Sequence, residues 1–118
     1  MSENDGYFLS VDNMASLASI YVAEGAELEN SLAWPGYAEV AELRGLPPHV
    51  ISVNELDPLR DEGLEHFAKL AAAGVSVYGR TVAGSIHAGD CLSAAWAPEQ
   101  MEATLRDIKG FSDGLQAA

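Results

Sequence analysis

Two short β-rich runs with a helix-like segment between them constrain the fold of this chain more than any other feature. The run 49–53 (HVISV) lies between a proline pair and an Asp-Pro dipeptide, which favours a buried parallel strand. A second run, 75–82, alternates apolar and polar residues after Gly74. Apolar residues recur at helical spacing between the two runs, at Leu64, Phe67, Ala68 and Ala71. The sequence therefore predicts a β-α-β unit with two parallel, neighbouring strands.

The boundaries of the middle helix follow from residues with known preferences at helix ends. Asp57 is a good capping residue and Pro58 fits the first helical position, so the helix is expected to begin there. Gly74 is expected to end it, because glycine readily adopts the left-handed conformation found after helices.

Two further helices are expected, one on each side of this unit. Apolar residues between 12 and 24 recur at i, i+3, i+4 and i+7, with Ser10 or Asp12 as the cap and Gly25 as the stop. The last helix opens at Pro98, and its apolar residues on one side are Met101, Leu105 and Ile108. The chain is therefore expected to carry an N-terminal and a C-terminal helix around the β-α-β unit.

The connection before the first strand is rich in proline and glycine and has no sustained period, so it is expected to be irregular. A short helical turn is expected at 39–44, and Trp34 is expected to be buried. No repeat or low-complexity tract divides the chain. We expect a single domain over 1–118, with the helix and irregular connection in 1–48 and a β-α-β-α segment in 49–118.

Composition limits the partners and the compartment. Six basic against eighteen acidic residues give a net charge of −12, which disfavours nucleic acid and anionic membranes as partners. The single cysteine, Cys91, cannot form an internal disulfide and is expected to be a small buried residue. The first residues lack the features of a signal peptide, and no apolar run approaches the roughly 20 residues that span a bilayer. We expect a cytoplasmic protein.

No metal or cofactor is expected. Acidic residues gather where the helix dipole favours them and without the spacing of a calcium loop, at Asp57, Asp61, Glu62 and Glu65. Cys91 with His87 makes neither a zinc ligand set nor a positioned dyad. His49 opens a strand, and His66 is expected on a solvated helix face, so neither is given a role. The sequence also lacks a phosphate-binding or dinucleotide-binding glycine motif.

Two residues with catalytic chemistry follow the two predicted strands. Asp57 comes soon after the first strand, and His87 follows the second after a glycine-containing loop. Because the carboxyl ends of parallel strands meet at one edge, the carboxylate could reach the imidazole. Such a bond would fix the tautomer and leave the other ring nitrogen free to accept a proton from a nucleophile. Spacing alone also fits simpler roles, with Asp57 as a helix cap and His87 bonded to backbone.

Several motifs, in their order and intervals, resemble the hormone-sensitive-lipase group of α/β-hydrolases. These motifs are ENDGYF (3–8), AWP (33–35), ELRGLPP (42–48), NELDPLRDEG (54–63), AGV (73–75) and GSIHA (84–88). The first three look most like the bacterial carboxylesterases related to brefeldin A esterase, so the resemblance covers nearly the whole chain. It implies a partial α/β-hydrolase fold in which 50–53 and 75–82 are the last two strands of the sheet.

The resemblance also implies roles for two residues. In that family the aspartate of Asp-Pro-Leu-Arg-Asp-Glu-Gly is the triad acid and the histidine of Gly-x-x-His is the base, which map to Asp57 and His87. The family's nucleophile lies in Gly-x-Ser-x-Gly on a strand-to-helix elbow, and its oxyanion donors come partly from a His-Gly-Gly-Gly segment. These 118 residues have no His-Gly-Gly-Gly, and their one Gly-x-Ser-x-Gly, at 110–114 (GFSDG), follows residues expected in the last helix and not a strand, so no nucleophile elbow is expected. A partial match at 74–78 (GVSVY) fails at its last position and lies along a predicted strand.

The sequence thus predicts the C-terminal fragment of a carboxylic-ester hydrolase, a serine esterase or lipase. We expect it to be inactive alone and to act on a small-molecule ester only when the N-terminal half complements it. The alternative is a non-catalytic α/β module that self-associates through an exposed sheet edge. A homo-oligomer is expected in both cases, with 75–82 and 98–108 as the contact surfaces.

Overall fold

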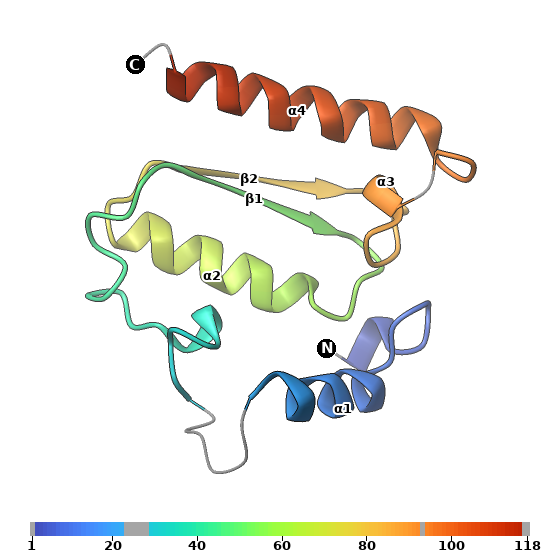
Figure 1. Cartoon of the computed structure of the whole chain (residues 1–118), viewed down its shortest axis with the longest axis horizontal. Helices are drawn as coiled ribbons and strands as arrows, with labels where there is room; N and C mark the ends of the chain where they lie inside the picture. Colours follow the sequence, from blue (N-terminus) through green and yellow to red (C-terminus); the bar gives the residue numbers. More distant parts are fainter. Residues whose placement is uncertain (1, 23–28, 93, 117–118) are drawn as a thin grey trace.

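The structure, a computed structural model, describes residues 2–22, 29–92 and 94–116. In chain order the elements are η1 (Ser2–Asn4), α1 (Val11–Tyr21), η2 (Pro35–Tyr37), β1 (His49–Asn54), α2 (Arg60–Ala72), β2 (Val77–Val82), α3 (Gly89–Leu92) and α4 (Pro98–Gln116). Figure 1 shows them in layers, with α4 over one face of the sheet, α2 under the other, and α1 beyond α2. The predicted α/β class, with a helix before and after the unit, is confirmed.

The β-α-β unit has the predicted parallel topology. β1 and β2 are hydrogen-bonded neighbours that run parallel, with His49 opposite Val77 and Asn54 opposite Val82. Both strands therefore end at the same edge, and the chain leaves that edge toward Asp57 in one case and His87 in the other.

Glycine at two positions lets α2 pack closely on the sheet. A Cβ atom on Gly63 would lie 2.7 Å from Cγ1 of Val53, and one on Gly79 would lie 3.3 Å from Cδ2 of Phe67. The contacts place Val53 and Gly79 on the face that meets α2. Since side chains alternate along a strand, the intervening residues face α4.

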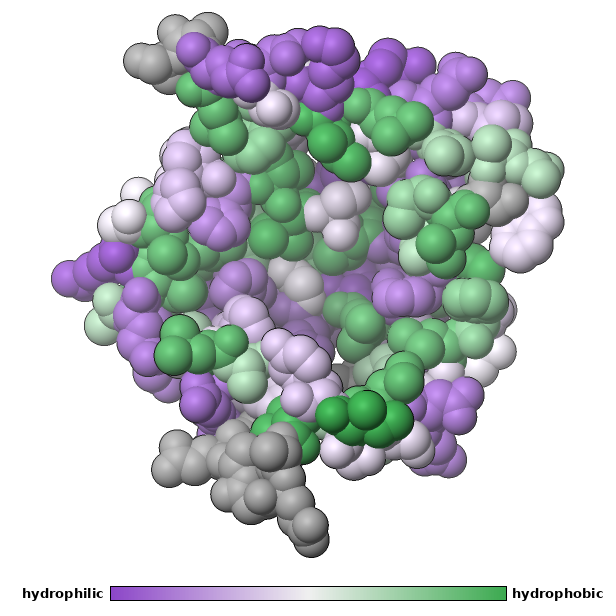
Figure 2. Space-filling view, viewed as in Figure 1, coloured by the Kyte–Doolittle hydropathy of each residue, from purple (hydrophilic) through white to green (hydrophobic). Residues whose placement is uncertain are grey.

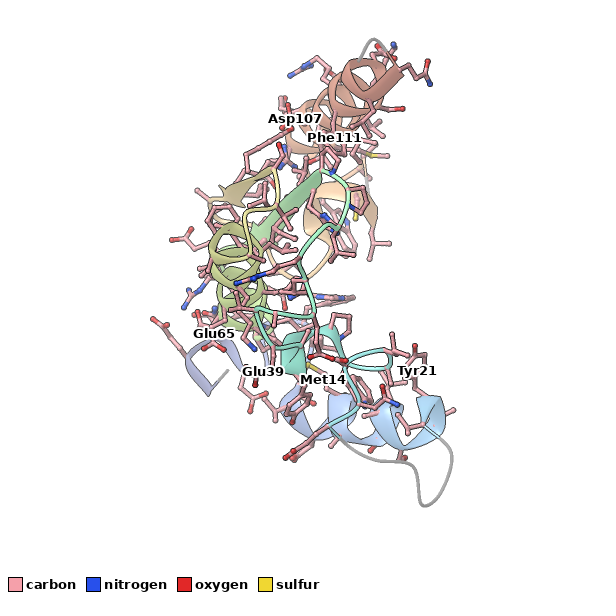
Figure 3. All side chains as sticks on the ribbon, turned by 90° about the vertical axis from the view of Figure 1, so that its left-hand side faces the viewer. Met14, Tyr21, Glu39, Glu65, Asp107 and Phe111 are labelled. Carbon is pink, nitrogen blue, oxygen red and sulfur yellow. The ribbon has the colours of Figure 1, made fainter. Side chains whose placement is uncertain are left out.

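The other face of the sheet meets α4, which opens at Pro98 as predicted. The ring of Tyr78 packs edge-on against Phe111, with ring centroids 6.3 Å apart. Figure 3 shows Asp107 and Phe111 on the side of α4 that faces the strands. In Figure 2 the outer side of α4 is hydrophilic and hydrophobic residues lie beneath it, so α4 is an amphipathic covering helix.

The core is small and centres on one leucine. Leu70 of α2 is fully buried and packs with Ala38, Leu43 and Val75. The C-terminal end of α2 has the predicted form, because Ala73 is the C-cap and Gly74 has φ of +79°. Among the described helices, none combines the length and apolar character that a bilayer crossing needs.

Several boundary predictions were wrong by a few residues. α2 begins at Arg60 with Leu59 as N-cap, whereas Asp57 was expected to cap it and Pro58 to open it. Asp57 instead opens a turn, in which the N–H of Arg60 donates to the Asp57 carbonyl oxygen at 3.1 Å. β2 begins at Val77 because the N–H of Val75 is used by the end of α2, where it donates to Leu70.

The N-terminal part also differs in detail. Ser10 caps α1 by accepting from the N–H of Asn13 at 3.2 Å, as predicted, while the expected stop at Gly25 lies outside the described residues. Residues 39–44 form hydrogen-bonded turns without a helix. Trp34 is half-buried where burial was expected, because it packs edge-on against Tyr21, with ring centroids 5.4 Å apart, and borders two open hollows.

Two side-chain predictions were also wrong. Cys91 is exposed, because it borders a solvent-open hollow on the α4 side of the sheet. His66 is half-buried, and its buried Nδ1 has no hydrogen-bond partner among the residues that the structure describes. Burial against the segment around Pro35 lowers the pKa of His66 below its usual value. The neighbouring charges of His49 and Lys69 lower this pKa further.

Candidate active site

The structure brings Asp57 and His87 into direct contact. Nδ1 of His87 lies 2.9 Å from Oδ2 of Asp57. Asp57 is 9% exposed, and its other oxygen, Oδ1, accepts from the N–H of Leu59 at 2.9 Å. An ionised carboxylate only accepts, so Nδ1 is the donor and the neutral ring is in the Nδ1–H tautomer. Within the described part of the chain, Nε2 of His87 has no hydrogen-bond partner.

The segment that carries Asp57 is held by groups from the start of the chain and from the end of β1. The N–H of Asp57 donates to the carbonyl oxygen of Asn54 at 3.2 Å. Asn4 is buried and donates through Nδ2 to the carbonyl oxygens of Glu55, at 2.8 Å, and Asp57, at 3.2 Å. The N-terminal 3₁₀ turn η1 therefore holds the backbone around Asp57.

The loop that carries His87 is tied to the same segment. The N–H of Leu56 donates to the carbonyl oxygen of Ser85 at 2.9 Å, and the N–H of Gly84 donates to Oε2 of Glu55 at 2.6 Å. Gly84 has φ of +68° and Ala88 has φ of +54°, so two left-handed residues turn the loop on either side of His87. The reversal points the imidazole back toward Asp57.

A buried polar cluster lies on the α4 side of the sheet. We call Asn54, Arg80, Asp90 and Thr104 the Asp90 cluster. Asp90 accepts from Nδ2 of Asn54 at 3.0 Å, from Oγ1 of Thr104 at 2.7 Å and from Arg80 at 3.1 Å. Burial opposes ionisation of Asp90, but the hydrogen bonds from Thr104 and Asn54 and the Arg80 charge together hold its pKa below the usual value.

His87 lies at the boundary of two hollows. A cavity of about 470 Å³ between the sheet and α4 is lined by polar groups that include Ser52, Asn54 and Asp57, and by His87 itself. A shallower groove of about 800 Å³ is lined mainly by apolar side chains of α1 and by Trp34, and His87 also reaches it. A small molecule in either hollow could therefore contact the imidazole.

Another histidine, His49, lies apart from this pair. Nδ1 of His49 lies 2.6 Å from the carbonyl oxygen of Pro47, at the opposite end of β1 from His87. Among the described residues, no three His, Cys, Asp or Glu side chains are grouped as metal ligands. The site is thus the Asp57–His87 pair with two adjoining hollows.

Comparison with known proteins identifies the family. Residues 1–89 match a family model described as the alpha/beta hydrolase fold. The chain belongs to the α/β-hydrolase family. It is 31% identical over 106 residues to an arylesterase of Saccharolobus solfataricus, covering 87% of this chain and 34% of that protein. It is 38% identical over 111 residues to the esterase LipI of Mycobacterium tuberculosis, covering 92% of this chain and 33% of that protein.

A solved structure matches the fold directly. The structure of brefeldin A esterase, described as a bacterial homologue of human hormone-sensitive lipase, superposes with a TM-score of 0.89 at 49% identity. The match covers 92% of this chain and 30% of that one. The predicted resemblance to the hormone-sensitive-lipase group is therefore confirmed, and the chain corresponds to the C-terminal part of such a hydrolase, about a third of the relatives' length.

The sequence interpretation overlooked the residues that hold the pair in place. Asn54 ends β1 three residues before Asp57, and Asp90 follows His87 by three residues, so both lie at the strand-end edge that was singled out. Polar side chains so close in sequence to Asp57 and His87 were an available signal. No sequence signal pointed to Thr104 or Asn4, because both lie in segments that are distant in sequence from Asp57 and His87.

Proposed function

We propose that this chain supplies the acid, Asp57, and the base, His87, of a serine-esterase triad. The proposal rests on one observation above all, the 2.9 Å contact between Nδ1 of His87 and Oδ2 of Asp57 beside a cavity. Asp57 holds the imidazole in the Nδ1–H tautomer and stabilises the imidazolium. Nε2 of His87 then accepts the proton of a serine hydroxyl and returns it to the leaving alcohol. Known relatives named as esterases support a carboxylic ester as the substrate.

The nucleophile in this proposal comes from a segment outside these 118 residues. Ser85 is the serine nearest to His87 in sequence, yet it is only 3% exposed and its hydroxyl contacts the Ile86 carbonyl oxygen at 3.4 Å. The one Gly-x-Ser-x-Gly pattern, at 110–114 (GFSDG), lies inside helix α4 and not on a strand-to-helix turn, so it does not form the strained elbow that presents a serine. Oxyanion donors are also needed, since they provide much of the rate in acyl transfer. We propose that residues 1–118 act as one C-terminal piece and that the rest of a hydrolase provides both.

The first prediction concerns esterase activity, both of this chain alone and of this chain mixed with the missing N-terminal part of a hydrolase. Alone, it is expected to hydrolyse p-nitrophenyl acetate no faster than buffer. Mixing it with the N-terminal two-thirds of brefeldin A esterase, the part that it does not match, is expected to restore hydrolysis that a fluorophosphonate blocks. Release of p-nitrophenol is followed by absorbance. A fluorophosphonate-sensitive rate from the chain alone would refute the missing nucleophile, and no rate from the mixture would refute the proposed function.

A second candidate function is a self-associating module, and the sheet favours it. In the described residues the sheet has two strands, so each presents an edge without a strand partner. Large apolar side chains are exposed on β2 and α4, at Tyr78, Leu105 and Ile108. Exposed edges and apolar patches favour association. We propose a homo-oligomer that forms through 75–82 and 98–108.

Sedimentation velocity tests this second candidate. The chain is expected to sediment above the monomer mass, and Ile108→Glu is expected to shift the equilibrium toward monomer because it places a charge in the contact. Ile20→Glu is the matched control, since Ile20 is 81% exposed and lies on α1, outside the proposed surfaces. A compact monomer at every concentration would rule the assembly out.

A further inference from the structure

The Asp90 cluster touches the loop of His87 and not the ring. Its members come from four elements, with Asn54 at the end of β1, Arg80 on β2, Asp90 on α3 and Thr104 on α4. Asn54, Asp90 and Thr104 are between 5% and 7% exposed. Arg80 also pairs with Asp107 on α4 and donates to Oγ of Ser52 at 2.9 Å. The cluster therefore joins both strands to both C-terminal helices directly behind the site.

Asn54 connects this cluster to the base. Its Nδ2 donates to the carbonyl oxygen of Ile86 at 2.9 Å and to Oδ1 of Asp90 at 3.0 Å. Ile86 immediately precedes His87, and Asp90 follows it by three residues. One amide group thus holds the loop on both sides of the imidazole. Asn54 also lies three residues before Asp57, to which its own carbonyl oxygen is bonded.

The energetics favour a positioning role over a purely stabilising one. A buried carboxylate pays a desolvation cost that its partners offset only partly, so a buried ion pair is weak evidence for stability. A fully satisfied buried network does fix geometry, because each of its members has one favourable arrangement. Both oxygens of Asp90 are bonded, one to Asn54 and the other to Thr104 and Arg80.

We propose that Asp90 is a positioning residue that keeps His87 against Asp57. Asp90 acts through Asn54 on the His87 loop, and Thr104 and Arg80 hold Asp90 in place. Because Thr104 lies on α4, this helix also contributes to the orientation of the base. This inference rests on the proposed function, because it assigns a purpose to the orientation of His87. Groups that orient a catalytic residue commonly change rates by about 10-fold to 100-fold.

The test replaces Asp90 by asparagine. An amide keeps the volume of the carboxylate but turns one acceptor into a donor that faces Asn54 or Arg80, so the loop is expected to loosen. In the full chain, two-bond ¹H–¹⁵N spectra of the imidazole should show His87 in the Nδ1–H tautomer, and Asp90→Asn should increase the share of the other tautomer. In the complemented assembly, kcat for p-nitrophenyl acetate should fall about 10-fold to 100-fold with KM nearly unchanged.

Two sets of variants separate positioning from general destabilisation. Asp113→Asn is the charge-matched control, because Asp113 pairs with Lys109 on α4 and touches none of the cluster. Thr104→Val removes the hydroxyl that Asp90 accepts from and should lower kcat in the same direction, while Thr104→Ser should restore it. The inference is overturned if Asp90→Asn lowers thermal stability but leaves both the tautomer and kcat at the wild-type values. If the wild-type assembly does not hydrolyse ester, the proposed function fails, and the tautomer measurement still decides the positioning role.

Discussion

Replacement of His87 by alanine in the complemented assembly is expected to lower kcat/KM for p-nitrophenyl acetate by about 10⁴-fold or more. The alanine has no ring nitrogen, so the serine proton has no acceptor at the position that Nε2 occupies. Asp57→Asn is expected to cost a similar factor, since an amide at Oδ2 no longer selects the Nδ1–H tautomer. Stopped-time assays with p-nitrophenyl acetate at several concentrations give kcat and KM separately.

The double variant makes the test of a triad sharper. Groups that act as one unit are strongly non-additive, so Asp57→Asn combined with His87→Ala should fall little below His87→Ala alone. His49→Ala is the matched control, because it removes an imidazole from the far end of β1. If His87→Ala retains a tenth of the wild-type rate, His87 is not the base. If the two single losses multiply, the residues act independently.

The β-α-β unit could be predicted because its signals are local. Two β-rich runs, the apolar period of the helix between them and Gly74 at its end correctly gave two parallel strands with a helix between them. Because parallel strands bring their carboxyl ends together, this topology also predicted that Asp57 and His87 lie near each other. Their 2.9 Å contact was expected from topology and not from any contact pattern in the sequence.

The start of α2 could not be predicted by the same rules. Asp57 and Pro58 both have strong preferences for a helix start, yet the carboxylate of Asp57 faces two demands. Its Oδ1 accepts from Leu59 and its Oδ2 contacts His87. The Asp-Pro pair therefore forms a turn that aims the carboxylate, and the helix begins later. The contact with His87, 30 residues further along the chain, therefore overrides the local preference of Asp57 and Pro58 for a helix start.

Burial predictions failed where the environment comes from distant segments. Cys91 was expected to be buried by residue type, but it borders the open hollow between the sheet and α4. His66 was expected in solvent beside acidic residues, but the segment around Pro35 covers it. The Asp90 cluster joins residues separated by 36 positions for Asn54 and 14 for Thr104, so no sequence period could reveal it.

Leu70→Ala is expected to be the most destabilising single change in the core, with a loss of about 2–5 kcal/mol in the free energy of unfolding. Leu70 is fully buried and contacts residues from both sides of the unit, including Leu43 and Val75. The buried core is small, so neighbours have few ways to fill the space that the missing atoms leave. A loss of this size is a large part of the roughly 5–15 kcal/mol that holds a typical domain folded.

Leu64→Ala on the same helix is the matched control. Leu64 is 42% exposed, so the same substitution removes fewer buried contacts, while the change in helix propensity is identical. Urea unfolding followed by circular dichroism should place the midpoint of Leu70→Ala well below that of Leu64→Ala, with the latter within about 1 kcal/mol of wild type. Equal losses for the two variants would mean that packing between α2 and the segment that carries Ala38 and Leu43 contributes little to stability. Leu70 would then not be the residue that holds α2 to the rest of the chain.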